Sequence, residues 1–154
     1  MTEPAATEPT TAPEAPNDSY FLDETPPKDW MLDDLVRLFT APGSGIGLTI
    51  QSNGASISGL VIGIEEYIDL LAKTFQDSPA PAMTALTDAW AASALKYAAV
   101  ENERDAAGLP LNAKRYIHMR DVRVFSGSVY LDLPLWRGAL RDVTGWSLGN
   151  VERD

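Results

Sequence analysis

The single histidine of this 154-residue chain, His118, is its one side chain that titrates near neutral pH. Catalysis by an imidazole needs a carboxylate and a nucleophile held around it. Asp121 follows three residues later, a spacing that on a strand places the two side chains on opposite faces. The chain has no cysteine, so a zinc site would lack thiolate ligands. We interpret His118 as a half-exposed strand residue, and we predict no catalytic residue, no metal site and no cofactor.

Three carboxylates, Glu65, Glu66 and Asp69, form a second candidate cluster within one helical turn. Paired acids can carry out acid–base or glycosidase chemistry. The same residues are favoured at the start of a helix, because the helix dipole attracts negative charge there. No cleft-lining aromatic residue can be assigned around them, so we expect them to be structural and the protein not to be an enzyme.

The segment 43–47, Gly-Ser-Gly-Ile-Gly, has the composition of a phosphate-binding loop. Such a loop follows a strand and opens a helix, whose N-terminus then faces the phosphate. Here the order is reversed, because the segment follows a predicted helix and precedes a predicted strand. We therefore interpret it as a flexible connection into that strand.

The last 42 residues combine arginines with aromatic residues, a composition that can stack and hold single-stranded nucleic acid. Two observations argue against that use. The net charge is −10, and simple strand alternation places Arg120 and Arg123 on opposite faces, which disperses the positive charge. A solvated face or a protein-binding surface is the favoured interpretation of this region.

Acidic residues and prolines are concentrated at the N-terminus. Residues 1–29 contain seven acids, one base and six of the eleven prolines. A segment of this composition cannot bury enough apolar surface to offset its conformational entropy, so residues 1–28 are predicted to be a disordered acidic tail. The chain has neither the pattern of a signal peptide nor an apolar run near the ~20 residues of a membrane span, so we expect a cytoplasmic location without membrane insertion.

The remaining sequence, 29–152, is predicted to form a single domain. A short amphipathic helix begins at Asp29, and two strands, 46–51 and 55–64, flank the hairpin turn Asn53-Gly54. A helix over 65–75 is followed by a long alanine-rich helical insertion, 77–112, which begins at Ser78-Pro79 and ends near Gly108. The C-terminal strands are predicted at 116–125, 129–133, 135–143 and 145–151.

This order of elements predicts an α+β fold. We expect two or three helices with a strongly bent antiparallel sheet, or a partly open small β-barrel, behind the disordered tail. Pro134 indicates an edge strand or a strand end, because proline cannot donate to the sheet ladder.

Three segments, 48–68, 116–122 and 135–149, together resemble the gas vesicle accessory protein GvpU family. The shared features are the strand pattern, the glycines and the run Trp136-Arg137-Gly138. The resemblance implies a non-enzymatic protein that is associated with gas vesicles and acts in their assembly or clustering through protein–protein contacts. The gas vesicle shell protein would then be the partner to consider first.

Four residues are predicted to make the partner contacts: Tyr116, Trp136, Arg137 and Trp146. Aromatic and arginine side chains dominate binding hot spots, although the two tryptophans could equally belong to the core. The same three segments are also similar, more weakly, to Sm-type small β-barrels. That resemblance implies an oligomer that binds RNA or protein, and the sequence leaves the oligomeric state open.

Overall fold

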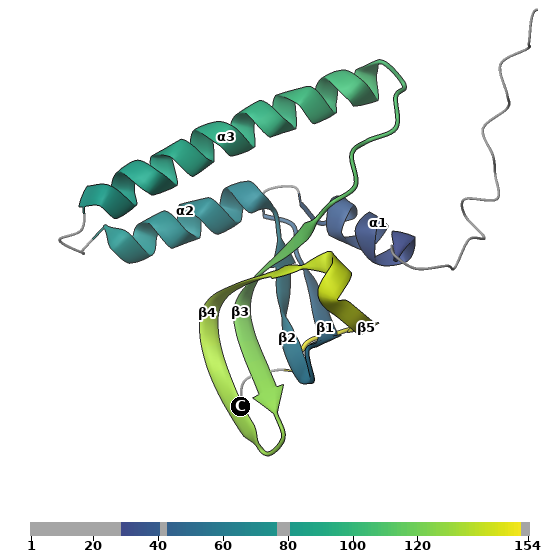
Figure 1. The fold of residues 1–154 in the computed structure, drawn as a ribbon, viewed down its shortest axis with the longest axis vertical. Coiled ribbons are helices and arrows are strands. Elements are labelled where there is room, and N and C mark those ends of the chain that lie inside the picture. The colour runs from purple at the N-terminus through teal and green to yellow at the C-terminus, as the bar shows by residue number, and fades with distance from the viewer. Residues whose placement is uncertain (1–28, 41–42, 77–80, 152–154) are drawn as a thin grey trace, which may run out of the picture.

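The computed structural model describes residues 29–40, 43–76 and 81–151, and it has three α-helices and a five-stranded antiparallel sheet (Figure 1). The elements are α1 (Trp30–Leu38), β1 (Ile46–Ser52), β2 (Ala55–Ile62), α2 (Ile64–Phe75), α3 (Pro81–Ala106), β3 (Tyr116–Ser126), β4 (Val129–Ala139), the 3-10 helix η2 (Leu140–Asp142) and β5 (Val143–Leu148). The strand order is β4-β3-β2-β1-β5, so the sheet ends at β4 and β5 and is not closed. The predicted α+β class is confirmed, and the predicted tail, 1–28, lies outside the described residues.

The β1–β2 hairpin forms where the sequence predicts it. Asn53 and Gly54 have φ angles of 50° and 78°, the left-handed values that a two-residue hairpin turn requires. Alternate side chains of β1 then point into the core, and Leu48 and Ile50 are fully buried. This turn sets the register of the two central strands.

The hydrophobic core lies between α1 and one face of the sheet. Helix α1 contributes Leu32 and Val36, which pack against buried side chains of β1, β2 and β3. The core residues from the strands are Leu48, Ile50, Ile57, Val61, Ile117, Met119 and Val122. Both Trp136 and Trp146 pack against this cluster from its margin. We call this side of the sheet the core face.

Strand β3 changes its alternation at Asp121, whose φ angle is +52°. The pairing of β2 with β3 shifts by one residue at this point, which leaves an extra residue in β3 opposite Gly59. A Cβ atom at Gly59 would lie 2.9 Å from Cγ2 of Val122 and 3.0 Å from the carbonyl oxygen of Arg120. The bulge therefore needs a glycine on the neighbouring strand.

The bulge corrects the predicted placement of the two arginines. Met119 precedes it and Val122 follows it, yet both belong to the core. Arg120 and Arg123 consequently lie on the same face of the sheet, opposite the core, and not on opposite faces as simple alternation predicts.

Helices α2 and α3 are inserted between the paired strands β2 and β3 and lie antiparallel to each other (Figure 1). Helix α3 covers most of the predicted 77–112 insertion and packs along α2, but only Thr87 and Ala94 of its 26 residues are buried. Just beyond its end, Gly108 has a φ angle of +65° and donates its N–H to the carbonyl of Asp105, as expected for a glycine stop. The predicted start at Ser78-Pro79 lies outside the described residues.

Of the predicted final pair of strands, 135–143 is wrong as a separate strand, whereas 145–151 overlaps β5. Strand β4 runs unbroken from Val129 to Ala139, followed by the turn η2 and the single strand β5. Pro134 does not end the strand because β4 is an edge strand, where a missing N–H costs no ladder hydrogen bond.

None of the helices in the described ranges is both long and apolar enough to cross a membrane.

Candidate functional site

Two of the four predicted contact residues, Tyr116 and Arg137, stack on each other on the face opposite the core. The guanidinium carbon of Arg137 lies 3.7 Å from the centroid of the Tyr116 ring, within the range of a cation–π contact. Tyr116 opens β3 and is 42% exposed, and Arg137 lies near the end of β4 and is also exposed. The pairing of β3 with β4 brings together two residues that are far apart in the sequence.

Beneath this pair lies His118, which is buried rather than half-exposed as predicted. Its ring packs against Tyr67 of α2 with a centroid distance of 5.0 Å. Arg137 donates a hydrogen bond from Nε to Nε2 of His118 over 3.2 Å, so the neutral ring accepts at Nε2. Burial, together with the positive charges of Arg137 and Lys114, lowers the pKa of His118 from 6.5 to about 4.

The two tryptophans among the predicted contact residues lie on the core face. Trp136 follows the alternation of β4 and folds over Gly138, where a Cβ atom would collide with the indole ring. Trp146 of β5 packs against the core cluster and donates from Nε1 to Oδ2 of Asp29 over 2.7 Å. The structure thus brings Tyr116 and Arg137 together and separates Trp136 and Trp146 from them.

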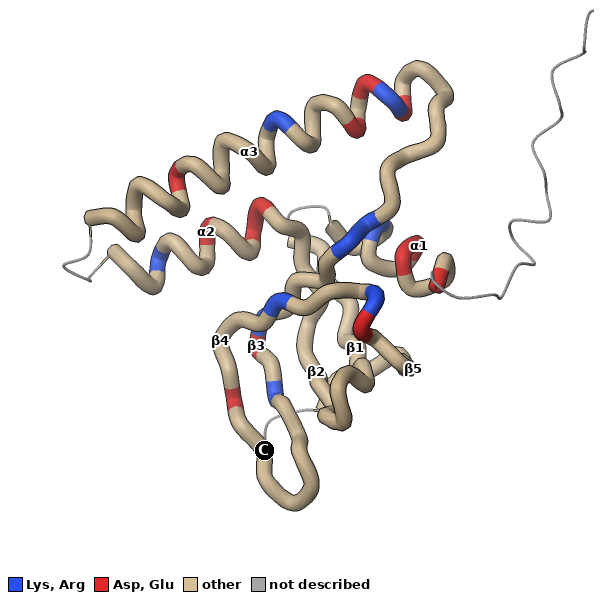
Figure 2. Tube along the Cα trace, viewed as in Figure 1, with Lys and Arg blue, Asp and Glu red and all other residues tan. Residues whose placement is uncertain are grey.

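The charges on the face opposite the core are arranged in pairs. Glu66 of the acidic trio forms an ion pair with Arg120 at 3.2 Å, which joins α2 to β3. Arg123 pairs with Asp132 across β3 and β4 at 2.8 Å (Figure 2). Because carboxylates neutralise both arginines, this face is not a continuous basic strip, although the two arginines share it.

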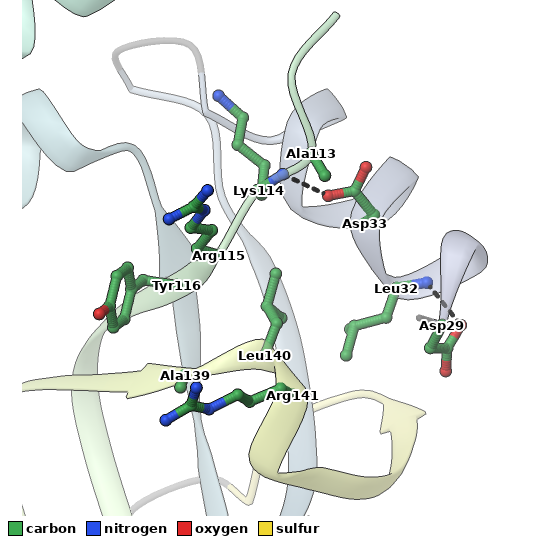
Figure 3. Close-up of a pocket in the computed structure, with 10 residues that line it drawn as sticks. All are labelled: Asp29, Leu32, Asp33, Ala113, Lys114, Arg115, Tyr116, Ala139, Leu140 and Arg141. Atoms are coloured by element: carbon green, nitrogen blue, oxygen red, sulfur yellow. Dashed lines mark hydrogen bonds between the residues drawn. The ribbon is translucent and has the colours of Figure 1, made fainter. Parts of the chain in front are cut away.

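A pocket of about 350 Å³ opens beside Tyr116, between α1, the segment before β3 and the end of β4 (Figure 3). Its lining residues are Asp29, Leu32, Asp33, Ala113, Lys114, Arg115, Tyr116, Ala139, Leu140 and Arg141. Leu32 and Leu140 extend toward each other across it and form its apolar floor (Figure 3). The volume is in the range of small ligand pockets.

The two acids of the pocket are satisfied by neighbouring donors. Asp33 is buried, accepts from the backbone N–H of Lys114 at 2.7 Å and pairs with Arg37 at 3.0 Å. Asp29 caps α1 by accepting from the N–H of Leu32 at 3.0 Å, and its other oxygen accepts from Trp146. Arg37 offsets the charge of Asp33, whereas both donors to Asp29 are neutral, so Asp29 keeps its negative charge at the pocket.

Two of the three bases of the pocket, Arg115 and Arg141, are less engaged. Arg115 takes part in no ion pair within the described ranges, and the Arg141 side chain is 84% exposed and forms an ion pair with its neighbour Asp142, at 3.6 Å. Lys114 is half-buried and its Nζ lies over the Tyr97 ring of α3, 5.6 Å from the centroid. Burial, followed by the charge of Arg37, lowers the pKa of Lys114. The rim of the pocket is therefore positively charged around an apolar floor.

Sequence reasoning missed this pocket, because its lining comes from three segments that are distant in the chain. One signal was present: Asp33 and Arg37 are spaced as an i,i+4 pair on a predicted helix. Within the part of the chain that the structure describes, no three histidine, aspartate or glutamate side chains are grouped so that they could hold a metal ion.

A family model described as "Gas vesicle protein GvpU-like" matches residues 29–151, which covers nearly the whole described region. No curated protein and no solved structure matches the chain.

Proposed function

The chain belongs to the GvpU-like family of gas vesicle proteins, and from this premise we propose that it is a non-enzymatic accessory protein that acts through protein–protein contacts. The proposed contact surface is centred on Tyr116 and Arg137, and the proposed partner is the gas vesicle shell protein. The role is vesicle assembly or clustering, with the protein associated with the vesicles.

The observation that supports this surface most directly is the exposed stack of Tyr116 on Arg137. A stacked pair loses little side-chain freedom on binding, because each partner already holds the other in place. Arg137 is further fixed by its hydrogen bond to His118, while its exposed side keeps donors for a partner. Aromatic and arginine side chains presented in this way are typical of binding hot spots.

Flotation of gas vesicles tests the proposal. Tagged protein is mixed with vesicles isolated from the host, and the fraction of protein in the buoyant layer is measured. Tyr116→Ala and Arg137→Gln should each reduce that fraction at least tenfold, since a lost hot spot costs about 1.4 kcal/mol or more. Glutamine at 137 removes the cation but keeps a donor for His118.

A second arginine–tyrosine pair provides the matched control. Arg123 lies 4.7 Å from the ring of Tyr130 on the same hairpin, distant from the pocket. Tyr130→Ala should leave flotation unchanged. Equal loss in the two tyrosine variants, or retention by both Tyr116 and Arg137 variants, would contradict the proposed surface.

The Sm-like alternative, an oligomer that binds RNA or protein, is favoured by one specific observation. Strands β4 and β5 are both sheet edges, and the exposed side chains of Val129, Tyr130 and Leu131 lie on one and Leu148 on the other. Antiparallel pairing of β4 with β5 of another copy could extend the sheet. Light scattering distinguishes the accessory protein from the Sm-like oligomer. A monomer at micromolar concentration excludes the Sm-like alternative. An oligomer that nuclease dissociates would replace the accessory-protein proposal.

A further inference from the structure

The pocket beside Tyr116 combines an apolar floor with a basic rim, and this combination selects a particular chemistry. Leu140 and the core residue Leu32 form the apolar floor, and Arg115 and Arg141 provide two positive charges beside it, whereas the Lys114 ammonium lies over the Tyr97 ring of α3. Of the two acids in the lining, Asp33 is paired with Arg37, and Asp29 accepts hydrogen bonds from two neutral N–H groups and keeps its charge. An occupant of about one or two apolar side chains flanked by carboxylates fits both features.

The chain itself contains one segment of this composition. Tyr20, Phe21 and Leu22 are consecutive, with Asp18 before them and Asp23 and Glu24 after them. No other aromatic residue occurs in residues 1–28, and these residues lie outside those that the structure describes. The charges of the segment are opposite in sign to those of the pocket rim.

The attachment point of the segment lies at the pocket. Asp29, the N-cap of α1, is one of the lining residues, and only six residues, 23–28, lie between it and Leu22. An extended chain of that length spans roughly 25 Å, which is enough to reverse direction and return to the opening. A short linker also holds the segment at a millimolar effective concentration, so weak contacts are sufficient.

We propose that the pocket formed by α1, residues 113–116 and residues 139–141 binds the chain's own segment 18–24. Phe21 and its neighbours occupy the apolar floor, and Asp23 and Glu24 pair with Arg115 and Arg141. The seated segment covers the pocket side of Tyr116, so docking opposes partner binding at the adjoining surface. That consequence depends on the proposed function, whereas the docking itself does not.

Paramagnetic relaxation enhancement in the full-length protein tests the docking directly. The chain has no cysteine, so Asn17→Cys gives a single site for a spin label. Amide peaks of residues 113–116 and 139–141 should lose at least half of their intensity, because a motif of millimolar affinity is docked for about half of the time at millimolar effective concentration and the docked state relaxes fast. Peaks at the β3–β4 turn, 127–129, serve as the internal reference.

Variants and controls separate the apolar and charged contributions. Replacing Tyr20, Phe21 and Leu22 together by alanine should abolish the broadening, and Asp23→Lys with Glu24→Lys should reduce it. Glu3→Lys with Glu8→Lys, the same charge change farther along the tail, should have little effect. On the pocket side Arg141→Glu should weaken docking, while Lys96→Glu on α3 should not.

Two outcomes would overturn the proposal. Broadening that persists in the triple alanine variant would show that the apolar residues are not what docks. A second sample mixes isotope-labelled protein without the spin label and unlabelled protein that carries it. Broadening in that sample equal to the broadening within one chain would assign the pocket to the tail of a second copy instead.

Discussion

Arg137 donates from Nε to Nε2 of His118 across the β3–β4 pair, and the same guanidinium covers the ring of Tyr116. One side chain thus satisfies a buried imidazole on one side and presents a stacked aromatic pair on the other. The contact also explains why His118 is neutral, because a protonated ring could not accept this hydrogen bond.

The pH dependence of stability should report the burial of His118. Its pKa is lowered from 6.5 to about 4 on folding, so between these values the unfolded chain binds a proton that the folded chain does not. Stability is therefore lost as the pH falls through this window, by about 2 kcal/mol between pH 7.5 and pH 5. Urea titrations at the two pH values measure the difference.

The control for this prediction is His118→Gln, which retains an acceptor for Arg137 and does not titrate. Since the chain has 22 acidic residues that also titrate, the relevant quantity is the pH-dependent difference between wild type and variant. If both lose the same stability over this window, His118 does not carry the effect.

Trp136→Ala should lower the free energy of unfolding by about 2–3 kcal/mol, because the indole packs against the core cluster and fills the space above Gly138. Arg137 is the next residue and lies on the opposite face of the sheet, so Arg137→Gln should lower the free energy of unfolding by less than about 1 kcal/mol. Urea unfolding of the two variants compares them. An unchanged midpoint for Trp136→Ala would instead favour a contact role for this tryptophan.

Asp29→Ala should destabilise the fold by about 1–2 kcal/mol, because it removes both the N-cap of α1 and the acceptor for Trp146. The indole N–H resonance of Trp146 should shift in the same variant. Asp29→Asn, which keeps a capping oxygen, should retain most of the stability. A thermal midpoint for Asp29→Ala equal to that of wild type would disprove the capping role.

Gly59→Ala should lower the free energy of unfolding by about 1–3 kcal/mol, because the added Cβ would lie 2.9 Å from Cγ2 of Val122 at the bulge. Gly145→Ala is the matched control, since a Cβ at that position meets nothing closer than Cγ of Gln51, at 3.9 Å. Thermal unfolding of the two variants gives the comparison. Equal losses would mean that the strand conformation, and not the contact at the bulge, requires glycine.

The parts of the fold that local chemistry determines could be predicted from the sequence. The turn at Asn53-Gly54 depends on two residues that tolerate positive φ, and the end of α3 depends on Gly108. The family resemblance was confirmed over residues 29–151. These features require no knowledge of which segments meet in space.

The rest depends on contacts between distant segments. Asp121 adopts a positive φ where β3 passes Gly59, and this reverses the alternation on which the placement of Arg123 was based. His118 is buried because α2 packs over it, which its own strand pattern cannot indicate. The contact roles of the four candidate residues stay predictions, although their faces are now known.

The long helix α3 has a consequence for how the molecule opens. Most of its surface faces water, including the large side chains of Leu86, Trp90, Tyr97 and Val100. Helix α2 lies beside only the first part of α3 (Figure 1), and Glu101 in the later part pairs with Arg37 of α1 at 3.8 Å. The amide protons of the helical hairpin should therefore exchange with solvent through partial openings that leave the sheet intact, at lower free energy than those of β1 and β2. The fold then consists of two cooperative units of unequal stability.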